Sequence, residues 1–157
     1  MKNKKCKYKL SIVGLGNYLM GDDGIGCELI KNFRKEKMPS DINLIEAGTA
    51  PINYLEEISH SREIIAVDAI KGGEKPGTIY RLSLEDLKET AVRDLHGFSL
   101  YNVIKISQNM TDFPVKVTIY GIEPKNIYLS LKLTMPVKKS LFKLKKVIKT
   151  HEIFNNL

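Results

Sequence analysis

The chain has 157 residues, enough for one domain with its own core, and its 43% hydrophobic and 27% charged residues are typical of a globular protein. No apolar run is long enough to span a membrane, and the basic start of the chain lacks a signal-peptide cleavage site, so we expect a cytoplasmic protein without membrane insertion. The net charge is +7, but eleven of the 25 basic residues lie in 2–9 and 138–149 and leave a mildly acidic middle, which argues against nucleic acid as a partner.

Short apolar runs alternate with stretches of helical periodicity, a pattern typical of α/β proteins. In chain order we expect a strand at 10–13, a helix from 25 to about 38, a strand at 42–46, a helix at 51–58, strands at 64–67 and 78–82, helices at 84–90 and 99–106, a strand at 115–122 and a helix at 134–148. The pattern predicts a single-domain, three-layer α/β sandwich over residues 1–157. Its sheet of about five strands is mostly parallel or mixed with helices on both faces, and residues 1–8 form a basic, flexible tail.

Polar residues follow the expected strands at three places. Asp22 and Asp23 lie in the turn after the first strand, Asp68 ends the third strand, and His96 precedes the fourth helix. Because ligands of doubly wound sheets bind beyond the carboxyl ends of the strands, these residues can converge at one edge. Two carboxylates and an imidazole would suit nickel, zinc, manganese or iron.

Each of these residues also has an ordinary structural interpretation. Asp22 or Asp23 can cap the following helix, Asp68 can accept backbone hydrogen bonds at a turn, and His96 can be a capping or surface residue. Cys6 and Cys27 belong to no CxxC pair, so we expect reduced thiols without a catalytic role.

Two other kinds of site are weighed against a metal site. Gly14 and Gly16 begin a nucleotide-binding pattern with Glu46 as the ribose-binding acid, but Leu19 stands at the third glycine position and two carboxylates would repel a pyrophosphate. There is no GxSxG motif, and an aspartic-protease dyad would require Asp23 and Asp68 to lie close together.

Five segments in order resemble the hydrogenase maturation protease family. They are GLGNYLMGDDGIG (14–26), EAGTAP (46–51), IIAVDAIKGGEKPGTIY (64–80), LHGFSL (95–100) and YGIEP (120–124), and the resemblance spans about residues 9–148. Any one segment is weakly specific, whereas five in this order are highly specific. The segment KNIYLSLKLT that follows departs from the family pattern because it lacks a glycine before its Leu-Ser pair.

The resemblance implies an endopeptidase that removes the C-terminal extension of a nickel–iron hydrogenase large-subunit precursor after nickel insertion. It implies that Asp23, Asp68 and His96 form the catalytic and metal-sensing site, with Asp22 as a helix cap or supporting acid. The nickel would be sensed on the substrate, and cadmium or zinc could substitute for it. The expected partner is the large-subunit precursor, and the enzyme is expected to be a monomer.

The peptide bond could be broken in two ways under this interpretation: the metal polarises the carbonyl or activates water, or a carboxylate acts as general base. The alternative functions are a non-catalytic, metal-responsive chaperone or binding protein of the same fold, and a nucleotide-binding module.

Overall fold

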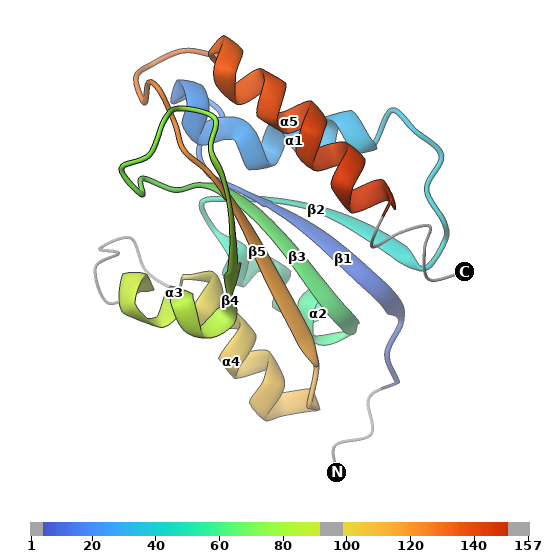
Figure 1. Ribbon diagram of the computed structural model, residues 1–157. Helices are drawn as coiled ribbons and strands as arrows, with labels where there is room; N and C mark the ends of the chain where they lie inside the picture. Colours follow the sequence, from blue (N-terminus) through green and yellow to red (C-terminus); the bar gives the residue numbers. More distant parts are fainter. Residues whose placement is uncertain (1–4, 92–98, 151–157) are drawn as a thin grey trace.

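The computed structural model describes residues 5–91 and 99–150, which form a five-stranded sheet between two layers of helices (Figure 1). The strands are β1 (Tyr8–Leu15), β2 (Ile42–Gly48), β3 (Ser61–Ala69), β4 (Ile79–Ser83) and β5 (Lys116–Ile122). The helices are α1 (Ile25–Phe33), α2 (Leu55–Ser59), α3 (Leu84–Ala91), α4 (Leu100–Thr111) and α5 (Met135–Ile148). Two short 3-10 helices, η1 (Gly21–Gly24) and η2 (Pro51–Tyr54), lead into α1 and α2.

The sheet has the strand order β2-β1-β3-β5-β4. The first four strands are parallel, and β4 runs antiparallel to β5 at the edge. The central strands are buried on both faces, so their sequences read as continuous apolar runs rather than as alternating ones. The predicted α/β sandwich with a mixed five-stranded sheet is therefore confirmed.

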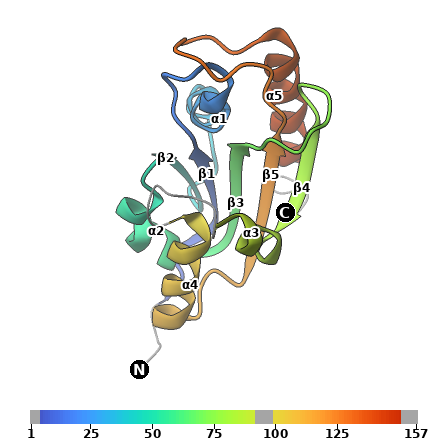
Figure 2. The ribbon, with the colours of Figure 1, turned by 90° about the vertical axis from the view of Figure 1, so that its left-hand side faces the viewer.

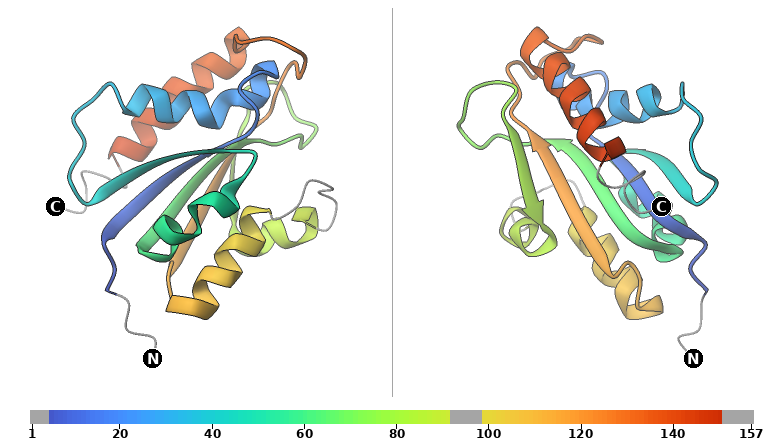
Figure 3. Two further views of the ribbon diagram at one scale, coloured as in Figure 1. Left: turned by 180° about the vertical axis from the view of Figure 1, so that it is seen from behind. Right: turned by 45° about the vertical axis from the view of Figure 1, so that its right-hand side comes forward.

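Helices cover both faces of the sheet, as Figures 2 and 3 show from three further directions. On one face α1 and α5 pack against the strands through fully buried side chains such as Phe33 and Leu141. On the other face α2 and α4 form a second core with Ile58 and Ile104 at its centre, and α3 packs beside them. These helices bury the faces that their 3.6-residue periodicity predicts.

An ion-pair cluster fastens the end of α1 to α5. Glu36 follows α1 and binds Lys145 at 2.7 Å through one carboxylate oxygen and Lys149 through the other. Their hydrogen bonds lower the pKa of Glu36 to about 2. The two helices of this layer are therefore joined by charge as well as by apolar packing.

Several boundaries differ from those predicted. Helix α1 ends at Phe33 rather than near residue 38. Tyr8, expected in the basic tail, is the first residue of β1, and the backbone N–H of Lys7 donates to the carbonyl of His60 at 2.8 Å. Helix α4 runs beyond residue 106 to Thr111, where Asp112 adopts a left-handed conformation with φ of 69° and ends the helix. Within the described residues, no helix combines the length and hydropathy needed to cross a bilayer.

Candidate active site

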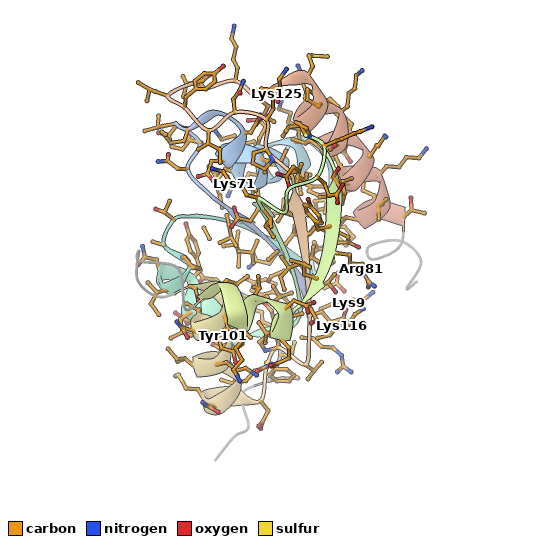
Figure 4. The ribbon with its side chains drawn as sticks, turned by 60° about the vertical axis from the view of Figure 1, so that its left-hand side comes forward. Lys9, Lys71, Arg81, Tyr101, Lys116 and Lys125 are labelled. Carbon is orange, nitrogen blue, oxygen red and sulfur yellow. The ribbon has the colours of Figure 1, made fainter. Side chains whose placement is uncertain are left out.

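The loops that follow β1, β3 and β5 lie at one edge of the sheet (Figure 2), because these strands are parallel. Asp23 lies in η1 directly after β1, and Asp68 is the penultimate residue of β3. In Figure 4, Lys71 after β3 and Lys125 after β5 mark this end of the molecule, whereas Lys9 and Lys116 mark the opposite end. Both aspartates thus lie where the parallel strands end, at the end of the sheet called the carboxyl edge below. Proteins of this fold class bind ligands at this end of the sheet.

Gly16 brings the two aspartates together. A Cβ atom at Gly16 would lie 1.9 Å from the backbone oxygen of Asp23 and 3.3 Å from Oδ1 of Asp68. Gly16 also has a φ of 104°, which disfavours any side chain. The turn therefore requires a glycine, and the Asp23 backbone and the Asp68 carboxylate flank it.

A second glycine allows α1 to approach the sheet. A Cβ atom at Gly26 would lie 2.2 Å from the backbone oxygen of Val67 and 2.4 Å from that of Leu15. The first turn of α1 consequently packs against the backbone at the ends of β1 and β3. This close approach sets the position of η1, and with it Asp23, relative to Asp68.

Backbone N–H groups orient both carboxylates. Oδ2 of Asp23 accepts a hydrogen bond of 2.9 Å from the N–H of Asn17, and Oδ1 of Asp68 accepts one of 2.8 Å from the N–H of Ala69. Both side chains are half-buried, so solvent or a bound chain can reach them. The arrangement offers two positioned carboxylates that can accept a proton or ligate a cation.

The third predicted site residue, His96, lies outside the described residues. Among residues 5–91 and 99–150, no three His, Cys, Asp or Glu side chains gather closely enough to hold a metal ion. Two carboxylates alone provide fewer ligands than the three protein ligands typical of an open metal site. The site of Asp23, Asp68 and His96 therefore remains a prediction. Two of its members, Asp23 and Asp68, lie at the expected edge of the sheet.

Asp22 has a structural role that the sequence did not reveal. It was expected to cap a helix or support the site, but η1 and α1 begin at Met20 and Gly24 without any side-chain cap. Instead, the fully buried Asp22 carboxylate accepts hydrogen bonds from the backbone N–H groups of Lys125 (2.9 Å) and Asn126 (3.0 Å).

The Asp22 carboxylate also binds Thr134, the N-cap residue of α5. The backbone N–H of Thr134 donates to Oδ1 at 2.7 Å, and its hydroxyl donates to Oδ2 at 2.8 Å. Asp22 therefore joins the loop after β1 to the loop after β5. The cap interpretation is wrong because the bonding partners lie more than a hundred residues away in the sequence.

Glu123 is a second buried carboxylate at this edge that the sequence reasoning did not single out. It accepts hydrogen bonds of 2.6 Å from the N–H of Gly72 and from the hydroxyl of Tyr80. The Tyr80 hydroxyl, and then the backbone N–H of Gly72, lower the pKa of Glu123. Glu123 thus holds the loop that follows Asp68, and its place in the segment YGIEP was the signal that could have identified it.

Cys27 lies beneath the same turn. Its Sγ atom is 3.4 Å from the carbonyl oxygen of Gly16, and the side chain is 1% exposed. Burial, followed by the charge of Glu46, raises its pKa to about 11, so it stays a thiol at neutral pH. Both cysteines are free, as predicted, and Cys27 does not supply a nucleophile at this edge.

The nucleotide-binding alternative gains no support from the geometry. Glu46, its candidate ribose ligand, forms a 2.7 Å ion pair with Arg34. The chain after Gly16 continues into η1, which carries Asp22 and Asp23 rather than a glycine-rich phosphate cradle.

Comparison with known proteins identifies the family. The profile of the hydrogenase maturation proteases matches residues 27–151, a range that includes Asp68 and His96 and begins just after Asp23. A protein of Methanocaldococcus jannaschii, whose name assigns it provisionally to the hydrogenase maturation proteases, is 32% identical over 76% of this chain and 78% of its own. The coenzyme F420 hydrogenase subunit delta of Methanothermobacter thermautotrophicus is 28% identical over 85% of this chain and 87% of its own.

The fold agrees with this assignment. The crystal structure of a NiFe hydrogenase maturation protease, HycI from Thermococcus kodakarensis KOD1, superposes with a TM-score of 0.77 at 23% identity and 89% coverage of both chains. The predicted family is therefore confirmed by the profile, which covers four of the five segments, and the architecture agrees with it. The chain belongs to the hydrogenase maturation protease family, a family of peptidases.

Proposed function

We propose that this protein is the endopeptidase that removes the C-terminal extension of a nickel–iron hydrogenase large-subunit precursor after nickel has been inserted. The observation that carries the proposal is the position of Asp23 and Asp68 around Gly16, at the carboxyl edge of a maturation-protease fold. The reaction is assigned to the cytoplasm and to a monomeric enzyme, as expected from the sequence.

In this proposal, the nickel ion arrives as part of the substrate. Carboxylate oxygens from Asp23 and Asp68, with an imidazole from His96, form a ligand set that suits a borderline divalent cation. Because these ligands gain binding energy only from a precursor that already carries its metal, they discriminate against the metal-free precursor. The three residues thus couple cleavage to completed nickel insertion.

Hydrolysis requires a base that accepts a proton from the attacking water and an acid that returns a proton to the leaving amine. A carboxylate at this edge can perform both steps in turn, because the backbone N–H of Asn17 or Ala69 holds one oxygen in place. A divalent ion close to the scissile carbonyl would add polarisation of that carbonyl.

The test compares nickel-loaded with metal-free precursor, with intact-mass spectrometry as the readout. We expect wild-type protein to shorten the nickel-loaded precursor by one C-terminal peptide and to leave the metal-free precursor intact. Equal cleavage of both precursors would reject nickel sensing, and cleavage of neither would reject the endopeptidase assignment.

Metal binding to the enzyme itself provides a second readout. We expect nickel, cadmium or zinc to bind weakly in the absence of precursor, since three ligands with open positions hold a metal less firmly than a closed four-ligand site. Calorimetric titration of wild type and His96→Ala should show a lower affinity in the variant. Equal affinities would remove His96 from the ligand set.

A second candidate function is a non-catalytic partner of a hydrogenase. It is favoured by the relative named as a hydrogenase subunit, which covers most of this chain. In that case the protein would remain bound to the large subunit after mixing, without any change in the mass of the precursor.

A further inference from the structure

Large apolar side chains are exposed on two loops beside the candidate site and at the first residue of α5. They form a surface, here called the apolar platform, that comprises Tyr18, Leu19, Tyr128, Leu129, Leu131 and Met135. Leu129 is 80% exposed and Leu131 74% exposed. Contiguous exposed apolar surface of this kind typically marks an interaction site.

Backbone hydrogen bonds hold the two loops together. Ser130 lies between the two exposed leucines of the second loop; its N–H donates to the carbonyl of Leu19 at 2.9 Å, and its carbonyl accepts from the N–H of Gly21 at 2.8 Å. The loops lie side by side at one end of the molecule in Figures 1 and 3. The buried Asp22 carboxylate fixes both ends of the second loop through Lys125, Asn126 and Thr134. The platform is therefore preformed, which lowers the entropic cost of binding a partner.

The platform contains a shallow pocket. The pocket has a volume of about 230 Å³ and is lined by Tyr18, Gly21, Gly24, Glu28, Lys31, Leu131 and Leu133. The ammonium group of Lys31 lies 5.0 Å from the centre of the Tyr18 ring. This pocket, which shares Tyr18 and Leu131 with the platform and has Glu28 and Lys31 in its wall, can accept an anchoring side chain of a partner.

The platform is continuous with the candidate active site. Tyr18 and Leu19 belong to the same turn as Asn17, whose N–H orients the Asp23 carboxylate. The platform therefore borders the Asp23 side of the candidate active site.

The positive charge around the platform indicates which kind of partner surface it can bind. Residues 124–138 contain three lysines and no acidic residue. Lys125, Lys132 and Lys138 are exposed next to the platform in sequence, and Figure 4 shows Lys125 at this end of the molecule. A complementary partner would present apolar side chains surrounded by carboxylates. The same lysines would repel a second copy of this chain.

We propose that the apolar platform is the docking surface for the large-subunit precursor, and that it binds an apolar patch with an acidic rim near the scissile segment. This inference rests on the proposed function, because it takes the partner to be the protein cleaved at the adjacent edge. The loop that departs from the family pattern, KNIYLSLKLT, would then set which precursor the enzyme accepts.

The test measures the affinity of nickel-loaded precursor for immobilised protein by biolayer interferometry. The platform variant is Leu129→Ser with Leu131→Ser. The matched control is Met110→Ser with Val115→Ser, which changes two exposed apolar residues at the end of α4 and just before β5, at the other edge of the sheet. We expect the platform variant to bind at least about tenfold more weakly than wild type and the control, with affinity also falling as salt is added. In cleavage assays the loss should appear mainly as a higher KM.

Equal affinity of wild type and the platform variant would overturn the docking proposal, as would the absence of binding by wild type. Light scattering tests whether the platform binds a second copy of this chain instead. If the only effect of the platform variant is to convert a dimer to a monomer, the surface joins two copies of this chain and the proposal fails. The mass assay keeps the two proposals separate. If binding depends on the platform but the precursor is not cleaved, only the endopeptidase assignment is rejected. If the precursor is cleaved and the platform variant has unchanged affinity and KM, only the docking proposal is rejected.

Discussion

Replacing Asp22 by Asn tests whether a buried carboxylate, rather than a helix cap, holds the carboxyl edge together. The fully buried side chain accepts four hydrogen bonds, two from Thr134 and one each from the backbone N–H groups of Lys125 and Asn126. All four partners donate to it. Asn has one oxygen and one NH₂ group, so one of the two acceptor positions must become a donor.

The less costly orientation of Asn points its NH₂ group at the N–H of Thr134 and keeps the bonds at the other oxygen. That orientation loses one hydrogen bond and buries two facing donors, at about 1–3 kcal/mol for each unsatisfied group. The expected loss is therefore about 2–6 kcal/mol, which is large against a total stability of about 5–15 kcal/mol. For a domain of this size it corresponds to a Tm lower by about 4–24 °C.

Calorimetry or thermal denaturation of Asp22→Asn, with Asp23→Asn as the matched control, measures this loss. Asp23 is half-buried, and its carboxylate accepts a hydrogen bond from Asn17, so the control should unfold close to the wild-type temperature. A Tm of Asp22→Asn within about 2 °C of wild type would contradict the role assigned to the buried carboxylate, because it would match the behaviour of a helix cap, where Asn and Asp are equivalent.

Three further changes test other parts of the structure. Gly16→Ala should lower the free energy of unfolding by about 2 kcal/mol or more and abolish processing. Gly73 also has a positive φ but has open space around it, so Gly73→Ala should lower the free energy of unfolding by less. Comparing the thermal denaturation of the two variants isolates the effect of crowding at Gly16. Glu36→Gln should lower the Tm at pH 7, and this difference should shrink as the pH falls from 4.5 towards 2, because the stabilisation is complete only above the ordinary pKa of 4.5 and is lost as the pH falls through the lowered pKa of about 2. A Tm difference at pH 2 as large as that at pH 7 would contradict the ion-pair explanation. Glu123→Ala should speed tryptic cleavage within residues 71–77 about fivefold, whereas Glu123→Gln, which keeps an acceptor for the N–H of Gly72, should not.

The secondary structure was predictable because each element carries its own signal. The apolar stripe of α5 at Val137, Leu141, Leu144 and Ile148 is fully buried, as its helical spacing indicates. The positions of Asp23 and Asp68 at one edge also followed from the sequence, since both come near the ends of parallel strands.

The roles of Asp22 and Glu123 were not predictable in the same way. Their hydrogen-bond partners are distant in the chain, with Asp22 bound to Thr134 and Glu123 to Gly72. Local patterns do not reveal such contacts, and an acidic residue before a helix has the same local appearance whether it caps that helix or binds a remote loop. The roles followed only from the packing of the loops after β1, β3 and β5. His96, named by the same strand-end reasoning, lies outside the described residues.

The intact mass of nickel-loaded precursor after incubation with wild type, Asp23→Asn and Asp68→Asn tests the roles of the two carboxylates in cleavage most directly. Both variants remove a negative charge and nearly preserve the shape of the side chain, so their folds should be maintained. We expect wild type to release one C-terminal peptide and each variant to slow this release by about a hundredfold or more, the scale of a lost general base. Cleavage by either variant at the wild-type rate would contradict the assignment of that carboxylate to the active site.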